Sequence, residues 1–168
     1  MMLIEILPVA VYEKEILRNL LEKYDYEFSQ YDNRDVGPLG LYGYPYLDHY
    51  WVEKNRFAFF IKVDGNLAGF FMVNDYPEVM RETDYTMAEF FVMHKYRRMG
   101  VGKYAAFWAF NRFRGRWQLK RHPKNTASVH FWNGVISQYT NGKYELIASC
   151  PGEPYDDGTL ADVFLFQT

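Results

Sequence analysis

The sequence predicts a mixed α/β (α+β) fold in which helices pack on one sheet. First, apolar runs that are typical of strands recur from residue 56 to the end of the chain. Second, residues 13–24 and 126–139 place apolar side chains at helical spacing. Third, Asp64-Gly65 stands between two apolar runs, which is a strong hairpin signal. Strands and helices in this arrangement indicate a sheet flanked by helices.

The elements follow a simple order along the chain. Residues 1–9 are expected to form a strand, and residues 13–24 an amphipathic helix. Further strands are expected at 56–64, 66–75, 85–93, 116–123, 144–150 and 159–167. Further helices are expected after Lys103 and at 126–139, where Asn125 precedes the second helix and Gly142 can end it. This order predicts a mixed sheet of about six to seven strands.

Residues 25–55 have no periodicity and are rich in Tyr, Asp, Gly and Pro. A structureless stretch of this length inside a domain is usually functional or carries short helices. Two interpretations remain open, a packed surface excursion and a lid that faces the substrate.

The composition limits the class of protein. A chain of 168 residues suits a single domain, 1–168, and aromatic residues at 20% indicate a heavy core, an aromatic-walled pocket, or both. The net charge of -2 argues against binding to nucleic acid, although Arg and Lys residues near Trp117 keep a nucleic-acid or protein-binding module as a third interpretation. The lone Cys150 suits a reducing compartment. With no apolar run of ~18 residues and no signal-peptide pattern, we expect a cytoplasmic protein and no membrane partner.

The segment "RRMGVGK", residues 97–103, combines glycines with cations between an expected strand and an expected helix. Helix N-termini present unpaired backbone N–H groups and a partial positive charge, and glycine lets a phosphate approach them closely. The segment therefore predicts a pyrophosphate-binding turn. It is neither a P-loop nor a dinucleotide fingerprint, because their spacings differ.

In this context the segment resembles a signature of the GNAT N-acetyltransferase superfamily. Residues 97–102 match its (Gln/Arg)-x-x-Gly-x-(Gly/Ala) pattern, and "NTASVHFW" from Asn125 is similar to its Asn-x-x-Ala-x-x-aromatic-Tyr pattern. The resemblance covers residues 56–144 and does not cover residues 25–55. It implies a GNAT-type acyl-CoA N-acyltransferase fold with a mostly antiparallel, splayed sheet. It also implies acetyl-CoA as co-substrate, no metal, and a homodimer as a common assembly.

The resemblance implies particular positions for acetyl-CoA. The pantetheine arm would pair with the strand backbone near Phe91, Val92 and Met93. The pyrophosphate would lie on the turn and helix start formed by Arg97, Arg98, Met99, Gly100, Val101, Gly102 and Lys103. Asn125 matches the asparagine near the pantetheine, and its alternative role is a plain N-cap.

The implied reaction is direct attack of a primary amine of a small molecule or peptide on acetyl-CoA, in a ternary complex. A base must remove a proton from the amine, and Glu89 is the best candidate because it is an acid in an apolar strand. The alternative is that alternation along the strand points Glu89 to the face opposite the cofactor, where it pairs with a cation. The usual family tyrosine position holds Trp132 instead. Tyr139 or a water could protonate the leaving thiolate, CoA could leave without a dedicated acid, or the chain could be a non-catalytic acyl-CoA-binding or sensory module.

The acceptor class is suggested by the acids of residues 25–55. Five carboxylates lie among tyrosines: Asp25, Glu27, Asp32, Asp35 and Asp48. A wall of acids and aromatic rings would attract a cationic amine through ion pairs and cation–π contacts. The alternative is a solvated loop whose tyrosines pack on the sheet.

Overall fold

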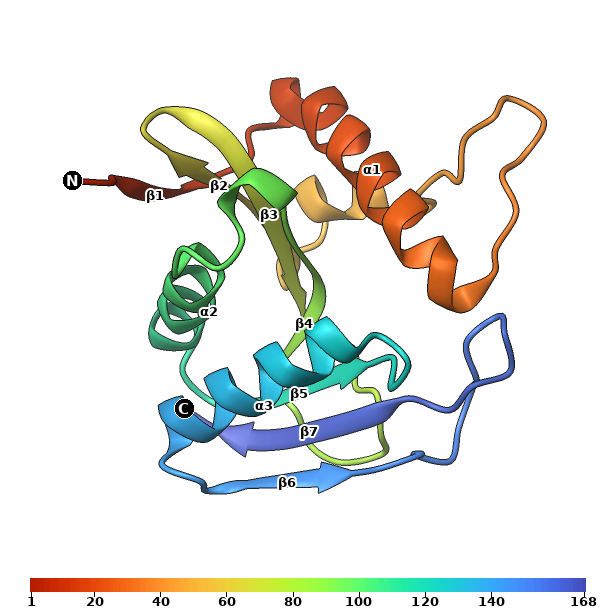
Figure 1. The fold of residues 1–168 in the computed structure, drawn as a ribbon, viewed down its shortest axis with the longest axis vertical. Helices are drawn as coiled ribbons and strands as arrows, with labels where there is room; N and C mark the ends of the chain where they lie inside the picture. Colours follow the sequence, from red (N-terminus) through yellow and green to blue (C-terminus); the bar gives the residue numbers. More distant parts are fainter.

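The computed structural model describes residues 1–168, which form one seven-stranded sheet with helices on both faces (Figure 1). The strands are β1 (Ile4–Pro8), β2 (Phe57–Val63), β3 (Asn66–Asn74), β4 (Tyr85–Val92), β5 (Arg116–Arg121), β6 (Tyr144–Ile147) and β7 (Asp162–Gln167). The helices are α1 (Lys14–Asp32), α2 (Val101–Arg112) and α3 (Thr126–Thr140), with short 3₁₀ helices at Val11–Glu13, Leu47–Trp51 and His94–Tyr96. The strand order is β1-β2-β3-β4-β5-β7-β6, and only β4 and β5 are parallel. The predicted mixed, mostly antiparallel sheet is confirmed.

Helix α1 is longer than the sequence pattern predicted. It continues past Tyr24 to Asp32, where Asn33 adopts the left-handed conformation and its N–H donates to the Ser29 carbonyl. The expected boundary was wrong because the last two turns carry aromatic and acidic side chains in place of aliphatic ones. Residues 25–55 therefore begin in a helix, contain the 3₁₀ helix Leu47–Trp51, and are irregular only in part.

Two apolar clusters lie on opposite faces of the sheet. One joins the sheet to α2 and α3, and the other joins it to α1 and the 3₁₀ helix Leu47–Trp51 (Figure 1). In β2, Phe59 and Ile61 belong to the first cluster, whereas Ala58 and Phe60 belong to the second. This alternation follows from the two-residue period of a strand. Because helices cover both faces of the sheet, side chains on both faces are apolar, and the strand sequences are nearly continuous apolar runs.

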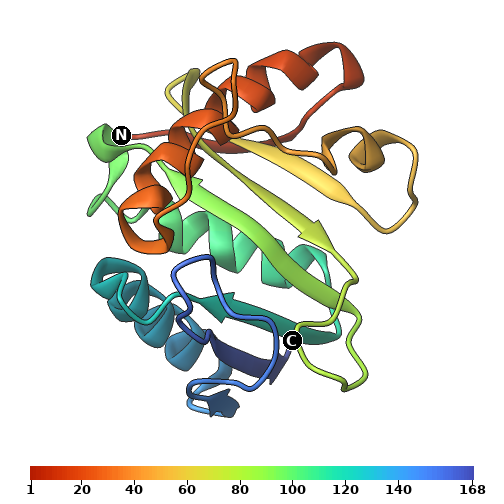
Figure 2. The ribbon, with the colours of Figure 1, turned by 90° about the vertical axis from the view of Figure 1, so that its right-hand side faces the viewer.

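The sheet splays between β4 and β5, as expected. These strands pair only at Tyr85 with Trp117 and at Thr86 with Gln118. Beyond these pairs the strands diverge, and from Met87 onward β4 has no partner on that side (Figure 2).

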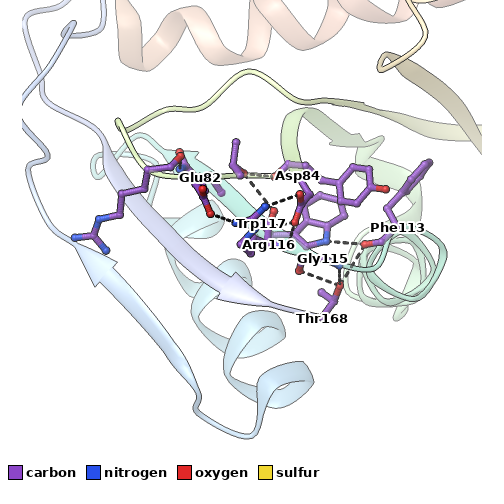
Figure 3. Close-up of polar contacts among 11 residues, drawn as sticks. Glu82, Asp84, Phe113, Gly115, Arg116, Trp117 and Thr168 are labelled. Atoms are coloured by element: carbon purple, nitrogen blue, oxygen red, sulfur yellow. Dashed lines mark hydrogen bonds and ion pairs between the residues drawn. The ribbon is translucent and has the colours of Figure 1, made fainter.

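A polar cluster holds the closed end of the splay together (Figure 3). The Arg116 guanidinium forms ion pairs with Asp84 and Glu82, and the Asp84 carboxylate also accepts from the Arg116 backbone N–H at 2.8 Å. The indole N–H of Trp117 donates to the Phe113 carbonyl at 2.8 Å. These contacts fix where β4 and β5 meet, and hence where they begin to separate.

Candidate active site

A single cleft of about 1430 Å³ occupies the splay. Its floor is β4 and the end of β5. Its walls are the second half of α1, residues 43–46, the start of α2, one face of α3 from Ala127 to Gln138, and the loop before β7. Segments that lie far apart in the sequence meet there, because the strands diverge between them (Figure 2). The cleft runs continuously from the N-terminus of α2 to α1.

The N-terminus of α2 has the features predicted for binding a phosphate. Gly100 adopts a left-handed conformation with φ of 81°, and no side chain caps the helix. The first helical bond shown at this end runs from the Tyr104 N–H to the Gly100 carbonyl. In an α-helix the N–H groups of residues 101–103 then have no intrahelical acceptor. The start of α2 therefore offers donors and partial positive charge to an anion.

Gly102 lies where the helix start meets the floor of the cleft. A Cβ atom there would be 3.1 Å from Cε2 of Phe131 and 3.6 Å from Cγ2 of Val92. The missing side chain thus leaves the helix backbone accessible between α3 and β4. A larger residue would fill the passage that joins the helix start to the strand.

The cations of the turn have different roles. Arg98 and Lys103 line the cleft and form no ion pair. Arg97 instead binds Glu27 of α1 through two contacts of 2.7 Å, and its Nε–H donates to the Val92 carbonyl at 2.6 Å. Met99 is exposed and does not line the cleft. Arg97 thus ties α1 to the end of β4, and its charge is already balanced.

Of the strand residues expected to pair with a ligand, Phe91 and Met93 direct backbone groups toward β3 instead of the cleft. The Met93 N–H donates to the Ala68 carbonyl of the neighbouring chain segment at 2.8 Å, and the Phe91 carbonyl faces Gly69 of β3. Because backbone groups alternate along a strand, Phe90 and Val92 face the open side. Phe90 was not among the predicted binding residues, although strand alternation from Val92 indicates it.

Asn125 is the N-cap of α3. Its Oδ1 accepts from the Ser128 N–H at 3.1 Å, and the residue also lines the cleft. The capping role is confirmed, while a contact with CoA stays a prediction. Trp132 is 5% exposed and packs edge-on against Phe90, with 4.9 Å between ring centroids. It forms part of the apolar wall of the cleft.

A bulge in β4 turns Glu89 toward α1. Met72 pairs with Glu89 and Val73 with Met87, so Ala88 is an extra residue in the strand. Ala88 packs with the cluster under α1, whereas Phe90 packs with the cluster under α2 and α3. The Glu89 side chain therefore lies on the face of the sheet that α1 covers. The start of α2 lies on the opposite face, but both border the same cleft.

Glu89 has the properties of a proton acceptor. The Tyr44 hydroxyl donates to its Oε1 at 3.3 Å. Loss of hydration raises the pKa of Glu89 to about 7, and the charge of Asp25 adds to the rise. The Tyr24 and Tyr44 hydroxyls and the more distant charge of Lys120 oppose this rise in pKa. A carboxyl with a pKa near neutrality can exchange protons at physiological pH.

Tyr139 does not reach the cleft. Its hydroxyl donates to Asn111 Oδ1 at 2.7 Å and accepts from Arg114 at 3.2 Å, while its ring packs on Phe107 and Phe110. The prediction that it serves as a proton donor is therefore wrong, because the tyrosine fastens the C-terminal half of α3 to α2.

Three of the five candidate acids line the cleft, namely Asp25, Glu27 and Asp32. Asp35 is exposed, and Asp48 pairs with Lys14 at 2.6 Å outside the cleft. The irregular segment after α1 still contributes to the cleft, since the Glu22 carboxylate accepts from the N–H groups of Tyr42 and Gly43.

The loop before β7 lines the cleft, which the sequence pattern did not predict. It brings Tyr155 to the cleft, where the ring lies 4.6 Å from His122 and 5.7 Å from Phe28 between centroids. No local pattern marks this loop, because its neighbours come from α1 and from the end of β5.

Comparison with known proteins agrees with this geometry. The family model described as "Acetyltransferase (GNAT) family" matches residues 15–134. The chain belongs to the GNAT acetyltransferase family. The family uses acetyl-CoA, and its match covers the turn 97–103 as well as the floor of the cleft.

Solved GNAT acetyltransferases share the fold across almost the whole chain. An acetyltransferase from Thermus thermophilus superposes with a TM-score of 0.67 at 14% identity, covering 98% of this chain and 97% of that one. Spermidine N-acetyltransferase from Vibrio cholerae, in complex with CoA and spermine, gives 0.64 at 11% identity, with 96% and 92% covered. A Bacillus cereus family member gives 0.65 at 12% identity, with 99% and 98% covered.

A search of curated proteins and the character of the helices each give a negative result. No curated protein matches the sequence. None of the three α-helices combines the length and the apolar character that crossing a membrane requires.

Proposed function

We propose that this GNAT acetyltransferase transfers the acetyl group of acetyl-CoA to a primary amine of a small molecule or peptide, within a ternary complex. One observation carries the proposal, namely the continuous cleft that joins the start of α2 to Glu89. One end suits an anion and the other holds a carboxyl with a pKa near neutrality. Residues 1–168 then act as one catalytic domain.

Acetyl-CoA would be held by the residues that the structure leaves open. The N–H groups at the start of α2, together with Arg98 and Lys103, suit the pyrophosphate. The open edge of β4 at Phe90 and at the Val92 N–H suits the amide groups of pantetheine, because a strand edge pairs with extended amides. The Val92 carbonyl is excluded, because it already accepts from Arg97. Gly102 leaves room between these two parts. The bound co-substrate supplies an acetyl group activated as a thioester.

Glu89 is proposed to receive the proton of the attacking amine. A primary amine with a pKa of ~10.4 arrives mostly as an ammonium. Once Glu89 takes one proton, directly or through water, the neutral nitrogen attacks the carbonyl carbon. The C–S bond then breaks, CoA leaves as a thiolate, and the second proton of the nitrogen passes to water. With Tyr139 outside the cleft and an indole at Trp132, this release proceeds through water or without a side-chain acid.

Thiol release tests this function. The protein is incubated with acetyl-CoA and a panel of primary amines, and free CoA thiol is followed over time. We expect release that depends on the amine, together with an acetylated product of matching mass.

The position of Trp132 favours a second candidate, a non-catalytic acyl-CoA-binding module. Tight binding of acetyl-CoA in calorimetry without amine-dependent thiol release would select that module over the enzyme.

Gly102→Val tests the placement of acetyl-CoA. The added side chain would fill the passage beside Phe131 and Val92, so calorimetry should show acetyl-CoA affinity reduced by about tenfold or more. Gly37→Val is the matched control, because this exposed glycine lies outside the cleft and a Cβ there makes only an ordinary contact, 3.5 Å from the Leu41 carbonyl oxygen. Unchanged affinity in a folded Gly102→Val protein would refute this placement.

A further inference from the structure

Asp25 is a buried carboxylate with an unused oxygen at the wall of the cleft. The residue is 5% exposed and lines the cleft. Its Oδ1 accepts from Arg34 Nη2 at 3.0 Å, whereas its Oδ2 is buried and has no hydrogen-bond partner in the protein. A buried acceptor without a donor is costly, and more so when it belongs to a charged group. A hydrogen-bond donor on a ligand in the cleft would satisfy this oxygen.

Arg34 does not balance the charge of Asp25, because Asp32 already pairs with it. Arg34 Nε donates to Asp32 Oδ2 at 2.6 Å, and the Arg34 backbone N–H donates to Asp32 Oδ1 at 3.1 Å. Two carboxylates thus share one guanidinium, and the group of three carries a net negative charge. The Asp156 carboxylate, 3.9 Å from Arg34 Nε, adds to it.

The other basic side chains at this end of the cleft also have acidic partners. Lys120 lies 3.3 Å from Glu78, and Arg121 lies 3.4 Å from Asp162. Arg97 is held by Glu27, and His122 contacts Asp157 at 3.2 Å. Glu89, by contrast, forms no ion pair and is contacted by a tyrosine hydroxyl. Among the carboxyls of α1 and β4 that line the cleft, Glu89 and Asp25 therefore remain without a cation of their own.

Aromatic rings lie along the helix face that carries Asp25. Tyr24, Phe28 and Tyr31 follow one another at helical spacing and line the cleft with Asp25. Tyr24 and Phe28 are 6.1 Å apart between ring centroids, and Tyr24 also packs on Phe91 of β4. Such a surface suits an aliphatic chain and favours an adjacent cation.

We propose that Asp25 binds a second ammonium group of the acceptor, so that the substrate is an aliphatic diamine or polyamine. One amino group lies at Glu89 and receives the acetyl group, while the other lies at Asp25 and keeps its proton. This inference rests on the proposed function for the reacting amine. The sequence suggested five acids that could select a cationic acceptor, and this inference assigns that selection to Asp25.

The test compares 1,n-diaminoalkanes with n-alkylamines of the same chain length, using initial rates at saturating acetyl-CoA. For the unmodified protein, kcat/KM for the best diamine should exceed that of its matched monoamine by about tenfold or more. Asp25→Asn keeps the shape and an oxygen for Arg34 but removes the charge, so this preference should fall to about twofold while monoamine rates persist. Asp35→Asn, an exposed change outside the cleft, should keep the full preference.

The outcomes separate this inference from the proposed function. Acetylation of monoamines and diamines with equal kcat/KM by the unmodified protein would overturn the role of Asp25 and leave the enzyme intact. Equal losses for both amine types in Asp25→Asn would also overturn it. If no amine is acetylated, calorimetric titration of the acetyl-CoA-bound protein with a diamine decides. Diamine binding that Asp25→Asn abolishes would then support the second site without the reaction, and diamine binding that it leaves unchanged would overturn the site.

Discussion

Glu89 shows how one extra residue in a strand sets the chemistry of a side chain. Without the bulge at Ala88, alternation along β4 would place Glu89 on the side of α2 and α3. The bulge turns it to the α1 side, where Tyr44 contacts it and loss of hydration raises its pKa to about 7. A proton acceptor therefore lies next to the surface on which we place the amine.

The raised pKa of Glu89 predicts the pH dependence of the reaction. Only the carboxylate can accept a proton, so kcat/KM should rise with pH through about 7 as Glu89 ionises, and further as more amine becomes neutral. Glu89→Gln should lose the inflection near pH 7 and lower kcat by about a hundredfold at a pH of about 7.5. The measurement is a pH–rate profile, with the exposed Glu15→Gln as control. If the Glu89→Gln protein keeps the inflection, another group is responsible for it.

Arg97 is the first residue of the family signature, yet here it forms a structural tie. Glu27→Gln should lower the free energy of unfolding by about 1 kcal/mol, because the pair is partly exposed. It should leave acetyl-CoA affinity unchanged within about twofold. Denaturant unfolding and calorimetry measure the two effects. A clear gain in affinity would instead mean that Glu27 withholds Arg97 from the pyrophosphate.

At the scale of elements, the junction of β4 and β5 controls the splay. Only two residue pairs join the strands, so the polar cluster around Arg116 supports a short connection (Figure 3). Gly115 is part of this junction: with φ of 155°, a Cβ atom there would lie 2.7 Å from Asp84 Oδ2. The close approach of Asp84 to the Gly115–Arg116 backbone therefore requires glycine.

The ion pair at this junction predicts a pH-dependent contribution to stability. Hydrogen bonds from Arg116 lower the pKa of Asp84 to about 2, below its ordinary value of 3.8. The Asp84–Arg116 ion pair therefore stabilises the folded state fully at pH values well above 3.8, and this stabilisation is lost as the pH falls through about 2. Asp84→Asn should lower the melting temperature at neutral pH, and the difference from the unmodified protein should shrink as the pH approaches about 2. A difference that stays constant across this range would exclude ionisation as its cause.

At the scale of the whole molecule, the cleft divides the sheet into two parts. Strands β1 to β4 lie with α1 and α2 on one side of the splay, and β5, β7 and β6 lie with α3 on the other (Figures 1 and 2). The proposed binding residues come from both parts, since Arg98 and Val92 belong to the first and Asn125 to the second. A ligand in the cleft would therefore connect them.

This arrangement predicts that acetyl-CoA stabilises the entire fold. A ligand that binds only the folded state stabilises it by about 2.7 kcal/mol at about a hundred times its dissociation constant. For a domain of this size, thermal unfolding should then shift upward by several degrees, as a single transition. Differential scanning calorimetry measures the shift, and Gly102→Val should reduce it. Two separated transitions with ligand would indicate that only one part is bound.

The sequence alone determined the elements whose signals are local. Strands β2 and β3 follow from apolar runs around Asp64-Gly65, α3 follows from helical spacing after Asn125, and the turn before α2 follows from its glycines and cations. Each of these patterns spans about ten neighbouring residues. It can be recognised locally, because it depends on the backbone preferences and the hydrophobic periodicity of those residues. The family signature lies in the same segments, so the fold and the glycine- and cation-rich turn before α2 could be predicted.

The tertiary structure decided which side chains meet in the cleft. It extends α1 to Asp32, turns Glu89 through a bulge, engages Arg97 with Glu27, and keeps Tyr139 away. These outcomes depend on partners up to 70 residues apart along the chain, so no local pattern records them. Burial and pairing then determine which charges remain unbalanced, and for that physical reason only the folded chain reveals the free oxygen of Asp25.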